Sequence, residues 1–223
     1  VIVENFAGTL QQVIDAVPTK RIVLAAMGDM LGFFKGLVVN HVVRNVKKMV
    51  PAFDLPGAVR FNDAIAQGRG KAYTAPPIGP DDIAVLQYTG GTTGVSKGAV
   101  LLHKNLIANV LQAEAWYQPA LAKIPPGEQI VTVCALPLYR IFGFNTNMML
   151  GMRMGGCNLL IANPRDIGGM LKELAKHKFH SFPAVNTLFN AMVNHADFST
   201  VDWSSLKISV GGGMAVQSAT AKQ

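Results

Sequence analysis

Charge is scarce in this sequence, and long apolar runs are missing. Charged residues make up 15% of the 223 residues, whereas they make up about 25% of an ordinary soluble protein. No uninterrupted apolar run reaches the roughly 18 residues of a membrane-spanning helix, because Asp29, Arg140 and Arg153 interrupt the longest stretches. The first residues also lack the pattern of a signal peptide. We therefore expect a cytoplasmic protein without a transmembrane helix.

Cysteine is rare as well. The two cysteines, Cys134 and Cys157, both lie in apolar, strand-like segments, so we predict buried free thiols in a reducing compartment. Neither the cysteines nor the histidines are spaced like the ligands of a metal site, and no catalytic triad is evident.

Hydrophobic residues, by contrast, are abundant. They make up 50% of the chain, and the mean hydropathy is +0.29, so either the core is large or part of the surface meets lipid or other protein. The net charge of +7 suits an anionic partner such as a nucleotide or an anionic membrane. A nucleic acid is not predicted, because the sequence contains no nucleic-acid-binding motif and no run of interleaved aromatic and basic residues.

Short apolar runs alternate with helical patterns along most of the chain. We predict strands at residues 1–3, 21–26, 83–87, 130–135, 158–161, 179–182 and 207–210. Helical patterns cover residues 8–16, 103–120, 142–154, 166–177 and 187–195, with Asp166 as a helix cap. This alternation predicts an α/β fold with parallel sheets flanked by helices.

A stretch rich in proline and glycine divides the chain into two parts. We assign residues 1–80 to the end of a first α/β subdomain with a basic insertion and a linker, and residues 81–223 to a second α/β subdomain. Residues 1–3 look like the tail of a strand and residues 216–223 like a helix that has just begun. We therefore expect this chain to be a fragment of a longer enzyme.

Residues 27–50 combine many apolar side chains with several cations. On a helix, Val39, Val42, Val43, Val46 and Val50 share one face, and the cations lie largely elsewhere. A basic amphipathic helix of this kind can lie in a membrane interface. A helix that packs on other protein explains the pattern equally well, and both alternatives remain open.

The motif that organises the chain is residues 88–98, with the sequence YTGGTTGVSKG, directly after a predicted strand. Its glycines let the backbone approach an anion closely, its hydroxyl side chains can donate hydrogen bonds, and Lys97 supplies a positive charge for phosphate oxygens. The spacing fits neither the common P-loop nor a dinucleotide-binding fingerprint. The alternative is a flexible turn without a ligand. The length of the stretch, its many hydroxyl side chains and the terminal Lys97-Gly98 favour a phosphate site.

Further short motifs follow in order: LPLY at 136–139, NPRD at 163–166, VNTLF at 185–189 and GGGM at 211–214. Together with residues 88–98 they resemble the adenylate-forming superfamily of acyl-CoA synthetases, luciferases and peptide-synthetase adenylation domains. In order and spacing they look like bacterial long-chain fatty acyl-CoA synthetases. The resemblance covers nearly the whole chain and implies part of the large N-terminal domain, with the small C-terminal domain and its catalytic lysine beyond Gln223.

The resemblance implies a two-step ligase reaction. A fatty carboxylate reacts with Mg-ATP to give an acyl-adenylate, and coenzyme A (CoA) then accepts the acyl group. The implied substrates are therefore a long-chain fatty acid, ATP and CoA, with Mg²⁺ as the metal, and the protein is expected in the cytoplasm or peripherally on the cytoplasmic membrane. We expect the fragment alone to be inactive. The alternative is a non-catalytic nucleotide- or lipid-binding module derived from the same fold.

The same resemblance assigns residues to the nucleotide. The implied ATP-binding residues are Thr89, Gly90, Gly91, Thr92, Thr93, Gly94, Lys97, Gly212, Gly213 and Met214. The Thr89 hydroxyl is the implied Mg²⁺ ligand. One departure is Ser96, where the superfamily usually has proline just before the lysine.

The implied acyl-binding residues are Tyr139, Arg140, Val185, Asn186, Thr187 and Gly211. For Asn186, a role in capping a turn explains the residue as well as a ligand contact does. Arg140 is a departure, because the superfamily usually has histidine after LPLY. A permanently charged guanidinium cannot copy a neutral imidazole; it can pair with a fatty carboxylate, pair with a phosphate, or obstruct the pocket.

Overall fold

The computed structural model covers residues 1–223 and describes residues 1–89 and 97–222. The described residues form two compact units, Val1–Pro76 and Pro77–Gln223, and each is presented by itself. The assignment of residues 1–80 and 81–223 to two subdomains of a larger enzyme stays a prediction.

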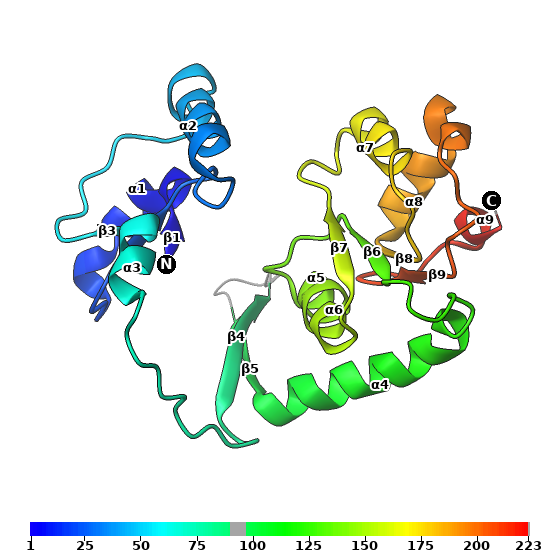
Figure 1. The fold of residues 1–223 in the computed structure, drawn as a ribbon, viewed down its shortest axis with the longest axis horizontal. Helices are drawn as coiled ribbons and strands as arrows, with labels where there is room; N and C mark the ends of the chain where they lie inside the picture. The colour runs from blue at the N-terminus through cyan, green and yellow to red at the C-terminus, as the bar shows by residue number, and fades with distance from the viewer. Residues whose placement is uncertain (90–96, 223) are drawn as a thin grey trace. The chain divides into compact units, whose positions relative to one another are not determined.

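The first unit is built on a small parallel sheet of order β1-β2-β3 (Figure 1). Its strands are β1 (Ile2–Val3), β2 (Val23–Ala25) and β3 (Val59–Arg60). The segment between β1 and β2 holds η1 (Glu4–Phe6), α1 (Ala7–Gln11) and η2 (Ile14–Ala16). The predicted parallel strands are confirmed, but the helix is shorter than predicted, because the backbone leaves the helical region at Val13 (φ −125°, ψ 1°).

A second layer of the first unit contains α2 (Phe33–His41), the π-helix η3 (Val42–Val46) and α3 (Phe61–Gly68). The five valines predicted to share one face do not have the same exposure: Val39, Val42, Val43 and Val50 are half-buried, whereas Val46 is 64% exposed. The reason is the π-helix, whose i→i+5 hydrogen bonds change the angular spacing of the side chains.

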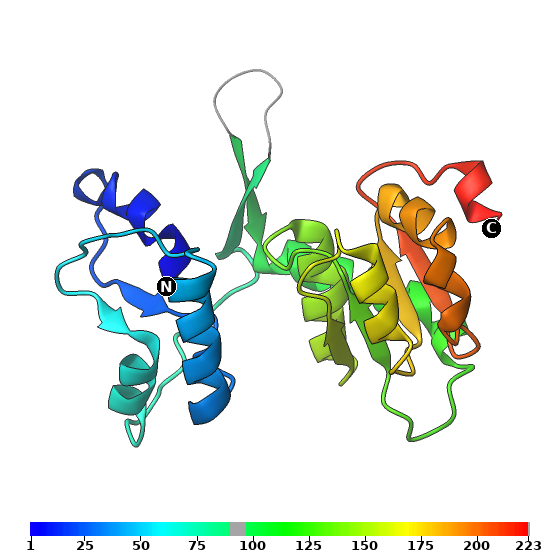
Figure 2. The same cartoon turned by 90° about the horizontal axis from the view of Figure 1, so that it is seen from above.

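The second unit begins with a hairpin of β4 (Ile83–Thr89) and β5 (Lys97–Leu102), which pair antiparallel. Figure 2 shows it as a ribbon that is not joined to the larger sheet. The prediction that 83–87 belongs to the parallel sheet is therefore wrong. Antiparallel strands can be joined by a short loop, whereas a parallel pair needs a crossover of about a dozen residues, and residues 90–96 are too few.

The main sheet of the second unit has four parallel strands in the order β7-β6-β8-β9. They are β6 (Val131–Cys134), β7 (Cys157–Leu160), β8 (Ser181–Ala184) and β9 (Ile208–Gly211). This confirms the expected α/β class, and the strands lie within a few residues of the predicted ranges.

Helices cover both faces of the main sheet (Figure 1). One face carries α7 (Ile167–Leu174) and α8 (Asn186–Val193), followed by η5 (Ala196–Thr200), and the other carries α4 (His103–Leu121), α5 (Ile141–Gly143), η4 (Phe144–Met149) and α6 (Leu150–Arg153). The last helix is α9 (Ser218–Ala221). The predicted cap of α7 is confirmed, since the Gly169 N–H donates to Asp166 Oδ1 at 2.9 Å.

The helix predicted over 142–154 is divided by the π-helix η4, and a buried asparagine accounts for the division. Asn147 is fully buried, and its Nδ2 donates to the Val133 carbonyl at 3.0 Å and to Asn158 Oδ1 at 3.2 Å. Asn158 Nδ2 in turn donates to the Asn147 carbonyl at 3.0 Å. These bonds fasten the helix to β6 and β7 and hold the loop after β6 in place.

The two thiols differ in exposure. Cys134 is buried in β6, and this burial raises its pKa. Cys157 is exposed, so the prediction that both thiols are buried is wrong. Cys157 is the first residue of β7. This strand lies at the edge of the sheet and pairs only with β6 among the described strands.

Candidate functional site

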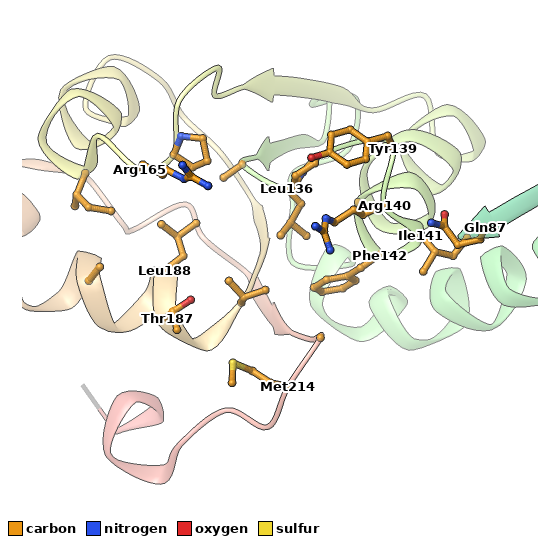
Figure 3. Close-up of a pocket in the computed structure, with 18 of the residues that line it drawn as sticks. Gln87, Leu136, Tyr139, Arg140, Ile141, Phe142, Arg165, Thr187, Leu188 and Met214 are labelled. Carbon is orange, nitrogen blue, oxygen red and sulfur yellow. The ribbon is translucent and has the colours of Figure 1, made fainter. Parts of the chain in front are cut away.

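A cavity of about 890 Å³ lies at the carboxyl ends of the parallel strands (Figure 3). In parallel α/β sheets this edge is where ligands bind. Its walls come from the loops after β6, β7, β8 and β9, and Gln87 and Tyr88 of β4 also contribute. Most of the remaining lining is apolar, including Leu136, Ile141, Phe142, Ile167, Leu188 and Ala191.

The wall after β6 is a tight corner. The Arg140 N–H donates to the Pro137 carbonyl at 3.1 Å, and the Arg140 carbonyl accepts from the Phe144 N–H at 2.8 Å, which starts the following helix. Tyr139 is 78% exposed, and Arg140 Cζ lies 6.0 Å from the centroid of its ring. Both predicted residues line the cavity, and the Arg140 guanidinium points into it (Figure 3).

Three predicted acyl-binding residues follow β8, and only two of them line the cavity. Val185 and Thr187 line the cavity. Asn186 between them does not; it is 6% exposed, and its Oδ1 accepts from the Gln217 N–H at 2.9 Å. This bond ties the start of α8 to the segment after β9, so the Asn186 side chain contacts a distant part of the backbone, which is neither of the two predicted roles.

Of the residues 211–214 that follow β9, only the last two line the cavity. Gly213, with φ +77°, and Met214 line the cavity, and Gly211 and Gly212 do not. A Cβ on Gly212 would lie 2.6 Å from Phe142 Cζ, and one on Gly211 would collide with Val216. These two glycines therefore let the Phe142 ring and the following chain pack directly on the backbone.

The predicted phosphate motif is described only at its two ends. Thr89 ends β4, Lys97 opens β5, and the two pair in register. Gly90, Gly91, Thr92, Thr93 and Gly94 lie outside the described residues, as does the side chain of Thr89. Gln87, directly before the motif, and Tyr88, its first residue, line the cavity, so the motif begins at the cavity wall.

The charge of the cavity is of one sign. Arg140 and Arg165 line it, and none of the described lining residues is Asp or Glu. Residues 163–166 form one of the motifs of the sequence, but no role was predicted for Arg165. A signal was present: the motif directly follows a predicted strand, and loops at that end of a parallel strand line the ligand crevice.

No group of three or more His, Cys, Asp or Glu side chains in residues 1–89 and 97–222 is placed to hold a metal ion. No helix in the same part of the chain is long and apolar enough to cross a membrane. The role of Thr89 as a Mg²⁺ ligand stays a prediction.

Comparison with known proteins decides the family. The sequence model described as AMP-binding enzyme matches residues 10–223. The chain belongs to this family. The long-chain-fatty-acid–CoA ligase of Escherichia coli O6:H1 is 50% identical over 223 residues, and that of Salmonella typhimurium is 48% identical. Both alignments cover 100% of this chain and 39% of the relative, so the chain spans about two fifths of the length of these ligases.

Solved structures agree on the fold. The anthranilate CoA ligase AuaEII, in complex with anthranoyl-AMP, superposes with a TM-score of 0.61 at 24% identity, over 89% of this chain and 37% of that one. The N-terminal domain of FACL13 from Mycobacterium tuberculosis also gives a TM-score of 0.61, at 18% identity, over 96% of this chain and 50% of that one. The predicted α/β class and the resemblance to adenylate-forming enzymes are confirmed.

Proposed function

We propose that the protein carrying this chain is an AMP-forming long-chain fatty acid–CoA ligase. The observation that carries the proposal is the cavity, with mostly apolar walls, two arginines and no described acidic lining residue. An acid with an alkyl chain offers matching chemistry: an anionic head for a guanidinium and an apolar body for the walls. The names of the relatives that match the full chain support the same substrate class.

The proposed reaction has two steps. The fatty carboxylate attacks the α-phosphorus of ATP, which forms the acyl-adenylate and releases pyrophosphate. The CoA thiol then attacks the acyl carbon, and AMP leaves. The chain contributes positioning and charge: residues 89–97 for the phosphates, Gly213 and Met214 for the nucleotide, and the cavity-lining Tyr139, Arg140, Val185 and Thr187 for the acyl group. Magnesium, when bound, would neutralise phosphate charge.

A lysine substitution in the full-length protein tests this function. We expect Lys97→Ala to slow pyrophosphate release at limiting ATP about tenfold or more, because a charge-assisted phosphate contact contributes about 1.5–3 kcal/mol. Lys123→Ala, an exposed lysine beyond the end of α4, is the control. Unchanged release in Lys97→Ala would remove Lys97 from the site, and the absence of palmitoyl-CoA from palmitate, ATP and CoA would overturn the ligase.

A second candidate is a non-catalytic nucleotide- or lipid-binding module on the same fold. The observation that favours it is Arg140, which lines the cavity where the superfamily usually has histidine. Binding of ATP and palmitate without pyrophosphate release would support this candidate over the ligase.

We also propose that the protein binds peripherally to the cytoplasmic membrane. Support comes from α2, where Phe33, Phe34, Leu37 and Val38 are 75%, 81%, 57% and 63% exposed. Their spacing puts them on neighbouring positions of one helix face. Exposed cations, Lys35, Lys47 and Lys48, lie on the same segment, as in helices that lie in an anionic membrane interface.

A further inference from the structure

The loop between β7 and α7 holds Arg165 in a defined position. The Arg165 N–H donates to Asn163 Oδ1 at 3.3 Å, and the Asp166 N–H donates to the Asn163 carbonyl at 3.2 Å, so Asn163 closes a turn around Arg165. On the other side, Asp166 caps α7 by accepting from the Gly169 N–H. The backbone of Arg165 is therefore fixed between a turn and a helix cap, and its side chain takes no part in either.

This side chain extends into the cavity. In Figure 3 the Arg165 and Arg140 guanidinium groups enter from opposite walls and point toward one another. Among the described residues, neither guanidinium forms an ion pair with a carboxylate. The Asp166 carboxylate beside Arg165 is engaged in its helix cap.

Two like charges in one cavity repel each other, and an anion between or beside them offsets that repulsion. A guanidinium also binds carboxylate and phosphate oxygens through paired hydrogen bonds. We propose that Arg165 is an oxyanion-binding residue of this cavity, acting from the wall opposite Arg140. This inference rests on the proposed function and adds to it a second cationic contact for a substrate.

The order of the strands indicates which oxyanion fits. Arg165 follows β7 at one edge of the sheet, whereas Gly213 and Met214, the proposed nucleotide contacts, follow β9 at the other edge. We therefore expect the oxyanion at Arg165 to be a group other than the nucleotide's phosphates. The apolar neighbours Leu136, Ile167 and Leu188 in the same cavity suit an anion attached to an apolar chain. The two sources with this chemistry are the carboxylate of an acyl substrate and a phosphate of CoA.

Equilibrium binding to the full-length protein tests the proposal without turnover. The probes are decanoate, its uncharged counterpart decanol, CoA and AMP, and the variants are Arg165→Gln, Arg165→Lys and the control Lys172→Gln, an exposed lysine of α7. We expect Arg165→Gln to weaken the binding of decanoate or CoA about tenfold, since the loss of one charge-assisted hydrogen bond changes a dissociation constant by about that factor. Arg165→Lys should recover part of the affinity, and decanol and AMP should bind unchanged.

The outcomes separate the sources and the alternatives. If only the affinity for decanoate falls, the oxyanion at Arg165 is the acyl carboxylate. If only the affinity for CoA falls, the oxyanion is a phosphate of CoA. Unchanged binding of both anions, or an equal loss for decanol, overturns the proposal, because the latter is the result of lost packing alone. The readout is independent of catalysis: a protein that forms no acyl-CoA but loses decanoate affinity in Arg165→Gln fails the ligase proposal and keeps this one.

Discussion

Arg140 lines the cavity at the corner after β6, where the superfamily usually has histidine. An arginine side chain is longer than a histidine ring and carries its charge on a planar guanidinium, whereas histidine can act as a neutral imidazole. We predict that Arg140→His in the full-length enzyme increases acyl-CoA formation, more in the thioester step than in adenylation. The longer side chain would obstruct the route through the cavity, and the smaller ring would leave that route open.

Separate assays of pyrophosphate release and of CoA transfer measure the two steps in both proteins. A fall in both the affinity for the fatty acid and the rate in Arg140→His would contradict this prediction. That result would make Arg140 an anchor for the substrate carboxylate.

Glu4 is the most buried charged residue described in the first unit, at 1% exposed. Its carboxylate accepts from Arg44 Nε at 2.8 Å, from Arg44 Nη2 at 2.9 Å and from Arg60 Nη1 at 2.9 Å. Burial by itself raises the pKa of Glu4, but the hydrogen bonds and charges of Arg44 and then Arg60 outweigh it and lower the pKa. This group joins η1, η3 and β3.

We predict that Glu4→Gln destabilises the first unit by about 2 kcal/mol, the size of hydrogen bonds to charged groups at a buried site. The difference should be complete above the ordinary Glu pKa of 4.5 and disappear as the pH falls through the lowered folded-state pKa. Urea unfolding at several pH values measures it. Asp63→Asn, an exposed carboxylate in the first turn of α3, is the control, and equal effects of both variants would refute a special role for Glu4.

At the scale of elements, α2 with its exposed apolar face is the element for which we predict a membrane function. Binding to vesicles that contain anionic lipid should exceed binding to neutral vesicles, because each nearby cation contributes about 1 kcal/mol. Phe33→Ser with Phe34→Ser should weaken binding to both kinds of vesicle by removing buried apolar area. Co-sedimentation measures both effects.

The control for α2 is Tyr73→Ser, which removes an 83% exposed ring elsewhere in the first unit. Equal binding of the wild-type protein to neutral and anionic vesicles, or binding to neither, would contradict the membrane proposal. The alternative, that α2 packs on other protein, would then be favoured.

At the scale of the whole molecule, the chain is shorter than the ligases that it matches. It aligns over its whole length with 39% of the related ligases. We therefore predict that the 223 residues alone form no palmitoyl-CoA from palmitate, ATP and CoA. Thioester formation is measured beside the full-length protein as the positive control, and clear turnover by the 223-residue chain would show that these residues hold a complete active site.

The sequence by itself determined the α/β class, the family and most strands and helices of the second unit, whereas β3, β5 and α3 were not predicted. The reason is that these depend on local signals: apolar strands between helical periods, the Asp166 cap, and motifs of a few residues. The motifs at 136–139, 185–189 and 211–214 each follow a predicted strand, and parallel strands place their carboxyl ends together at one edge of the sheet.

Tertiary structure alone decided which segments meet. The partner of β4 is β5 and not a strand of the main sheet. Asn186 bonds to the distant Gln217 backbone, and Cys157 is exposed because β7 is an edge strand. The cavity brings Arg165 to face Arg140 from a different loop. No periodicity records these contacts, because they depend on how separate elements pack against one another and not on the residues adjacent in the chain.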